Sequence, residues 1–208
     1  MKRCIAICLG ALAIPLLAQT DRHTYTSADG AVQFKYSPAL IHCTRGPVRP
    51  GANVGWIEDS CLSQADLCDD DATKGTTIAC FAYPNDKFKD KPQFSAAVFF
   101  VGLVPVAKTQ ETCLDAAQEW LVHDSRATKI NGISARLFHT SDAWMSGGES
   151  GEIYRVFHAD KCYELGIQEV ETSTGGLDEG TFQEYTTQDA AEVDATLRLC
   201  LDSFKFLK

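Results

Sequence analysis

The sequence predicts a single α+β domain, in which a central antiparallel sheet is flanked by helices in an α/β/α sandwich-like arrangement. An opening hairpin at residues 25–36 is indicated by the turn pair Asp29-Gly30 and by alternating apolar side chains in its second strand. A meander is indicated by three strand candidates with short turns between them, at residues 130–141, 152–158 and 162–170. Two amphipathic helix patterns complete the order strands, helix, three strands and helix, which is typical of the α+β class.

Two further strands are expected between the opening hairpin and the first helix. Residues 76–83 form one β candidate. Residues 94–106 are the most apolar segment of the mature chain and are rich in valine and phenylalanine. Such a run predicts a central strand that is covered on both faces of the sheet.

Each predicted helix begins at a capping box, in which a threonine and an acidic residue three positions later bind the first free backbone N–H groups. The first box is Thr112 with Asp115, and its helix is expected to end near His123. The second box is Thr186 with Asp189, and apolar residues follow it at helical spacing. This last helix is therefore expected to pack one apolar stripe against the sheet.

Residues 1–18 have the layout of a secretory signal peptide, and residues 19–208 form the predicted exported domain. A positively charged start precedes an apolar stretch at residues 5–17, and cleavage is expected after Ala18, with Thr20 as the alternative. The stretch is shorter than the roughly 18 to 20 residues of a bilayer span, and no later apolar run is long enough. The sequence therefore predicts a secreted or periplasmic protein with no membrane span after signal cleavage.

The mature domain is expected to be strongly acidic. Loss of Lys2 and Arg3 with the signal leaves 17 basic against 28 acidic residues, so the formal charge changes from −9 to −11. The basic residues are scattered singly among carboxylates and form no patch that could neutralise phosphates. This composition argues against a nucleic-acid partner.

A long loop at residues 43–75 carries three of the seven cysteines of the mature chain. It is rich in Pro, Gly and Asp, and shows no helix or strand period. In an oxidising compartment we expect disulfides in this region, between Cys61 and Cys68 and between Cys43 and Cys80. The odd number of cysteines leaves at least one that is free or bonded to another molecule.

Two other cysteines, Cys113 and Cys200, lie on the apolar faces of the predicted helices. Each is expected either to be buried and inert or to be bonded to a strand cysteine such as Cys162.

The chain resembles the Mog1/PsbP-like superfamily in three segments. These are SADGAVQFKYSP at residues 27–38, KCYELGI at residues 161–167 and LDSFKF at residues 201–206. The resemblance implies a central antiparallel sheet flanked by helices and a noncatalytic accessory or binding role. The superfamily has no common catalytic residues to carry over, and the loop at residues 43–75 departs from its usual pattern.

Candidate catalytic residues are His139, His158 and Glu164, which lie on successive strands of the predicted meander. On one face of the sheet, they could supply general-base or zinc chemistry to a secreted hydrolase. The alternative is that each histidine is a partly exposed strand residue with an ordinary hydrogen bond. This alternative is preferred because a catalytic site must meet several geometric conditions at once.

Asp69 and Asp71 are candidate metal ligands because they alternate like the first ligands of a calcium loop. Lys74 stands where that loop requires glycine, and Cys80 stands where it requires a bidentate Glu. A solvated loop is therefore preferred over an irregular calcium site in a calcium-stabilised structural protein. We expect no cofactor.

Trp56 in the cysteine-bearing loop and Trp144 in a glycine-rich turn are the candidate binding residues. Amphipathic aromatic side chains on loops often anchor partners, although each could instead pin its own loop to the domain. The leading hypothesis is an exported, noncatalytic accessory or binding protein of the cell envelope or extracellular space. Its unknown protein or small-molecule partner is expected to contact residues 43–75 and the Trp144 turn.

Overall fold

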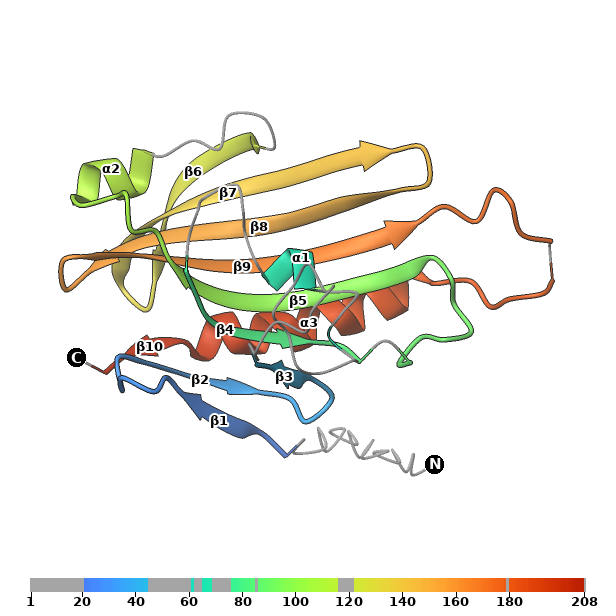
Figure 1. Ribbon diagram of the computed structural model, residues 1–208, viewed down its shortest axis with the longest axis horizontal. Helices are drawn as coiled ribbons and strands as arrows, with labels where there is room; N and C mark the ends of the chain where they lie inside the picture. Colours follow the sequence, from blue (N-terminus) through green and yellow to red (C-terminus); the bar gives the residue numbers. More distant parts are fainter. Residues whose placement is uncertain are drawn as a thin grey trace, which may run out of the picture.

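The computed structural model describes residues 21–44, 61, 65–68, 76–84, 86–115, 122–178 and 180–207. A large antiparallel sheet of seven strands dominates the fold, in the order β3-β4-β5-β9-β8-β7-β6 (Figure 1). Its strands are β3 (Ile41–Cys43), β4 (Thr76–Ala82), β5 (Phe94–Leu103), β6 (Val122–Ile130), β7 (Ile133–Trp144), β8 (Gly147–His158) and β9 (Lys161–Thr172).

A smaller sheet of three strands has the order β1-β2-β10. The remaining elements are β1 (His23–Thr26), β2 (Val32–Tyr36), α1 (Ala65–Cys68), α2 (Gln110–Asp115), α3 (Thr187–Ser203) and β10 (Lys205–Phe206). β1 and β2 form the predicted opening hairpin, and β10 pairs with β2, so the two ends of the domain meet in one sheet. Within the described ranges, no helix is both long and apolar enough to cross a membrane.

The predicted α+β domain with a central antiparallel sheet is therefore present in its coarse form. The long helix α3 runs along one face of the large sheet (Figure 1). The described parts of α1 and α2 are short, with 4 and 6 residues. Flanking of the sheet by helices in an α/β/α sandwich is not shown by the described residues.

The meander contains four strands, where the sequence predicted three. β6 occupies the region in which the first helix was expected to end, and residue 130 belongs to it rather than to β7. Asn131 and Gly132 form the tight turn between the two strands, with φ values of 48° and 84°. The prediction missed β6 because it is a polar edge strand with weak apolar alternation.

One of the two capping boxes was predicted correctly. The Thr186 hydroxyl accepts a hydrogen bond from the Asp189 backbone N–H, and the Asp189 carboxylate accepts one from the Thr186 N–H. At α2 the cap is Thr109, whose hydroxyl accepts from the Thr112 N–H at 3.1 Å, so the box predicted at Thr112 was wrong. The helix begins at Gln110, one turn earlier than its apolar pattern suggested.

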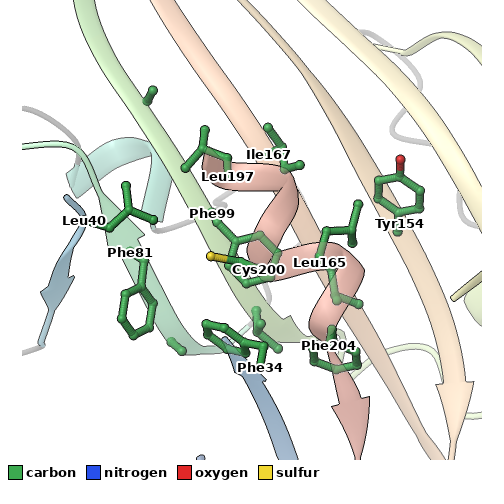
Figure 2. Close-up of a cluster of buried hydrophobic side chains, with 14 of the residues drawn as sticks. Phe34, Leu40, Phe81, Phe99, Tyr154, Leu165, Ile167, Leu197, Cys200 and Phe204 are labelled. Carbon is green, nitrogen blue, oxygen red and sulfur yellow. The ribbon is translucent and has the colours of Figure 1, made fainter. Parts of the chain in front are cut away.

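The main core lies between α3, the small sheet and one face of the large sheet (Figure 2). α3 contributes the apolar stripe that the sequence predicted. Its buried members are Val193, Leu197, Cys200 and Leu201. They pack with aromatic and aliphatic strand residues, among them Phe34, Phe81, Phe99 and Leu165. Full burial of one such side chain contributes about 1.5 to 3 kcal/mol, so this interface fixes α3 on the sheet.

The opposite face of the large sheet is also buried over β4, β5 and β9. Ala96, Val98 and Phe100 of β5 form a second apolar cluster with four cysteines. The Phe100 ring lies so close to Gly166 of β9 that an added Cβ would come within 2.0 Å of it. β5 is therefore covered on both faces, as its continuous apolar run predicted.

Candidate functional site

The three candidate catalytic residues do not form a shared site. His139 pairs with Glu152 in the β7–β8 register, whereas His158 lies six residues further along β8. At about 3.4 Å per residue, this offset separates the two histidines by about 20 Å along the strands. The hydrolase site proposed from the sequence is therefore contradicted by strand register.

Glu164 lies on the other face of the sheet from both histidines. Its neighbours Tyr163 and Leu165 belong to the core beneath α3, and side chains alternate between faces along a strand. The Glu164 carboxylate accepts a hydrogen bond from Arg155 Nε at 2.7 Å, with both side chains almost fully buried. This geometry assigns Glu164 a structural ion pair.

His139 lies between two carboxylates but makes a hydrogen bond to neither. Its Nε2 is 3.8 Å from Asp124 Oδ1 and its Nδ1 is 3.8 Å from Glu152 Oε1. Glu152 instead accepts hydrogen bonds from Arg198 Nη1 at 2.9 Å and from the Tyr154 hydroxyl at 2.6 Å. These bonds connect β8 to α3 at the edge of the core.

The electrostatics of this cluster follow from the same contacts. Burial acts to raise the pKa of Glu152, but hydrogen bonds from Arg198 and Tyr154 outweigh it and lower the pKa. Burial and the Glu152 carboxylate raise the pKa of Tyr154 to about 12. Glu152 is therefore held as a charged acceptor, and Tyr154 as a neutral donor.

His158 packs against the C-terminal strand. Its ring stacks on Phe206 with centroids 4.1 Å apart and planes at 20°. The two residues line an apolar cavity of about 330 Å³ between the β6–β7 turn and β10. This contact is consistent with a packing role for His158.

The four cysteines between residues 43 and 80 are paired, but the two predicted pairings were wrong. The disulfides join Cys43 to Cys61 and Cys68 to Cys80. Cys43 and Cys80 face each other in the β3–β4 register, and the Sγ atoms of Cys43, Cys68 and Cys80 lie within 4.8 Å of one another. Because the four cysteines converge, chain spacing could not distinguish the possible pairings.

The two helix cysteines, Cys113 and Cys200, show one each of the two predicted outcomes, a disulfide to a strand cysteine and a buried free thiol. Cys113 of α2 is bonded to Cys162 of β9. Cys200 is a free thiol on the buried face of α3, and burial raises its pKa to about 12. A thiol with such a pKa is protonated at neutral pH and is a poor nucleophile.

The tip of the β7–β8 hairpin carries exposed apolar side chains. Trp144 is 45% exposed and Met145 is fully exposed. They border a cleft of about 540 Å³. The cleft lies at the edge of the sheet where β7 and β9 end and β8 begins, and these strand ends lie side by side in Figure 1. Its other lining residues are Gly147, Gly148, Glu149, Ser150, Glu171, Thr172 and Ser173. Trp144, one of the two binding residues predicted from the sequence, therefore lies at a cleft.

Gly147 allows the Trp144 indole to lie close to the sheet. The two residues are directly opposite in the β7–β8 register. A Cβ at position 147 would lie 3.2 Å from Trp144 Nε1 and 2.3 Å from the Glu171 carbonyl oxygen. A larger residue would therefore displace the indole or the neighbouring strand.

Several candidate residues belong to segments outside the described ranges. Trp56, Asp69 and Asp71 lie outside the described residues, as does the predicted signal peptide. Met145, Glu149 and Glu171, which line the cleft with Trp144, were not predicted as site residues from the sequence. Strand alternation gave a signal for Glu149 on the face of Trp144. Glu171 lines the cleft from β9, with its side chain on the other face of the sheet, which only the pairing of β8 with β9 reveals.

No family model matches the sequence, and no curated protein matches it. Among solved structures, the Ran-binding protein Mog1p of Saccharomyces cerevisiae is similar at 10% identity and a TM-score of 0.44, covering 91% of this chain and 97% of that chain. Cyanobacterial PsbP from Synechocystis is similar at 11% identity and a TM-score of 0.41, covering 95% of this chain and 98% of that chain. A mutant of Mog1 is similar at 11% identity and a TM-score of 0.43, covering 90% and 97%. These comparisons concern the fold alone, and at that level the chain resembles the Mog1 and PsbP structures.

Proposed function

We propose that the chain is an exported, noncatalytic accessory or binding protein of the cell envelope or extracellular space. Its binding surface is the end of the β7–β8 hairpin, formed by Trp144, Met145 and the cleft beside them. The observation that carries this proposal is the adjacency of an exposed indole and a fully exposed thioether at a cleft. Aromatic side chains and methionine are enriched in protein interfaces, where they supply a large contact area.

Several features support export and a binding role. The charged and apolar layout of residues 1–18 fits a signal peptide, and three disulfides suit an oxidising compartment. The contacts of His158 and Glu164 are those of packing and of a buried ion pair. These contacts favour a binding role over the alternative of a secreted hydrolase.

Site-specific photo-crosslinking in the native host tests the proposed surface. Met145 is replaced by benzoylphenylalanine in the full chain, and Arg126 of the edge strand β6 is replaced in the same way as a matched exposed control. We expect one discrete adduct from position 145, absent from position 126 and weakened by Trp144→Ala. The same adducts from both positions, or an adduct that is insensitive to Trp144, would exclude this surface.

The crosslinked species is then identified by mass spectrometry and purified. Its affinity for the isolated protein should fall at least about tenfold with Trp144→Ala, as expected for a central interface aromatic. Unchanged affinity would contradict the proposal even if an adduct forms.

A further inference from the structure

The cleft beside Trp144 carries acidic charge. Glu149 is the acidic lining residue on the face of Trp144. Glu171 also lines the cleft, but it is opposite Gly148, so its side chain points to the other face of the sheet. Asp142 is directly opposite Glu149 in the β7–β8 register, so a second carboxylate on the same face lies next to the cleft. Like charges at opposed strand positions destabilise a sheet, and a bound cation relieves that repulsion.

Glu149 is held in place by a neighbouring strand. Its Oε1 accepts a hydrogen bond from Gln168 Nε2 at 2.8 Å, and Gln168 is itself buried. An amide donor orients a carboxylate without removing its charge. The cleft therefore presents an anionic group whose position is set by β9.

Trp144 adds a second element of cation recognition. The face of an indole attracts ammonium and guanidinium groups more strongly than other aromatic rings do. Gly147 lets the indole lie close to the sheet, and Met145 extends a flexible thioether at the rim. Methionine adapts its shape to aliphatic chains such as the stem of lysine. An aromatic face, an apolar rim and carboxylates thus meet at one cleft.

We propose that this cleft binds the cationic side chain of a lysine or arginine, presented by a basic peptide segment of a partner protein. The inference rests on the function proposed above and names the chemistry of its partner. The aliphatic stem lies against Trp144 and Met145, and the charged head group lies near Glu149 and Asp142. The volume of about 540 Å³ falls within the range of about 300 to 1,000 Å³ that is typical of ligand sites. The formal charge of −9 on the whole chain also favours approach of a basic segment.

Peptide titration tests this inference with the purified protein. The probe is a fluorescein-labelled Gly-Ser peptide with three lysines, compared with the same peptide carrying acetyl-lysines. Fluorescence anisotropy gives the two affinities. We expect at least about tenfold weaker binding of the acetylated peptide, because acetylation removes the cation–π and ionic contacts. Binding of the lysine peptide should also weaken with added salt.

Matched variants separate the cleft from general electrostatic attraction. Glu149→Gln with Asp142→Asn should weaken binding of the lysine peptide at least about tenfold, and Trp144→Ala should do the same. The control is Glu111→Gln with Asp202→Asn, which makes the same change of charge at exposed positions on α2 and α3 and should leave the affinity within about twofold. Equal weakening by both charge pairs would overturn the inference.

Failure of this inference can be told apart from failure of the proposed function. If both peptides bind equally and Trp144→Ala weakens both, the hairpin end is a docking surface but cation recognition is excluded. If neither peptide binds while position 145 still crosslinks one partner through Trp144, the cationic inference is likewise overturned and the proposed function stands. If crosslinking and peptide binding are both insensitive to Trp144, both proposals are excluded.

Discussion

Arg155 and Glu164 form an ion pair inside the protein, with Nε and Oε2 2.7 Å apart and side-chain exposures of 3% and 2%. They are direct cross-strand neighbours on β8 and β9. The Arg155 guanidinium also lies 5.8 Å from the centroid of the Phe138 ring. A buried ion pair is costly to break, because removal of one charged side chain leaves the other buried without its partner.

The first prediction concerns this pair. Glu164→Leu should lower the free energy of unfolding by about 3 to 5 kcal/mol, because Arg155 then keeps a buried charge without its carboxylate partner. The double variant Arg155→Leu with Glu164→Leu should recover much of that loss. Urea denaturation measures both. If the double variant loses as much unfolding free energy as Arg155→Leu and Glu164→Leu lose together, the two side chains contribute independently.

The strands were predictable where apolar residues alternate or run continuously. β2 shows alternation of Val32 and Phe34, and β5 is a continuous apolar run. β6 lacks such a signal because it is an edge strand whose described side chains are mostly exposed. Asn131-Gly132 did mark the hairpin turn in the sequence, and reading it as a turn would have separated β6 from β7.

The candidate site was only partly predictable. Trp144 was predicted as a binding residue because a tryptophan beside glycines in a turn is less certain to lie in the core than one on an apolar helix face. The separation of His139 from His158 could not be predicted, since it depends on the β7–β8 register. The cysteine pairing depends in the same way on how β3 and β4 bring four sulfur atoms together. Such relationships are set by long-range packing, which the local sequence does not encode.

A second prediction concerns the contact between Gly166 and Phe100. Gly166→Ala should destabilise the protein by about 1 to 3 kcal/mol, because the new methyl group overlaps the Phe100 ring. Gly176→Ala is the control, since nothing lies within 4 Å of a Cβ at that position. In a Phe100→Leu background, the alanine at position 166 should be tolerated better. Equal urea midpoints for Gly166→Ala and Gly176→Ala would contradict the close packing of Gly166 against Phe100.

The third prediction compares two disulfides by loop length. Cys113–Cys162 closes a separation of 49 residues, and Cys68–Cys80 closes one of 12. In the chain-entropy description, these loops contribute about 4 and about 3 kcal/mol. Replacing each pair by alanines, which removes the same side chains, should therefore destabilise more at the longer loop in guanidinium denaturation. The reverse order would show that native-state contacts dominate. Peptide mapping of the starting protein should first recover the pairs Cys43–Cys61 and Cys68–Cys80.

The fourth prediction concerns the reactivity of Cys200. Burial on the inner face of α3 raises the pKa of this thiol to about 12, so its thiolate is scarce at neutral pH and is shielded from reagents. In the mature chain, a maleimide should label no thiol in the native state and one after denaturation without reductant. Cys200→Ala should abolish the denatured-state labelling. Rapid native labelling that Cys200→Ala removes would show that α3 opens readily from the sheet.

The last prediction concerns stability in acid and the Glu152–Arg198 contact. Burial acts to raise the Glu152 pKa, but hydrogen bonds from Arg198 and Tyr154 bring it below its usual value of 4.5. A lowered folded-state pKa means that the contribution is present above pH 4.5 and is lost as the pH falls through the folded-state value. Arg198→Gln should therefore destabilise the protein by about 1 kcal/mol or less at neutral pH, as for a partly exposed pair, and by less below pH 4.5.

Because Arg198 also binds Asp194 at 2.8 Å, Asp194→Asn is measured alongside it and should leave the acid dependence in place. Urea denaturation of wild type and Arg198→Gln, from neutral pH to below pH 4.5, measures the difference in their free energies of unfolding. A difference that widens in acid would contradict the lowered pKa of Glu152.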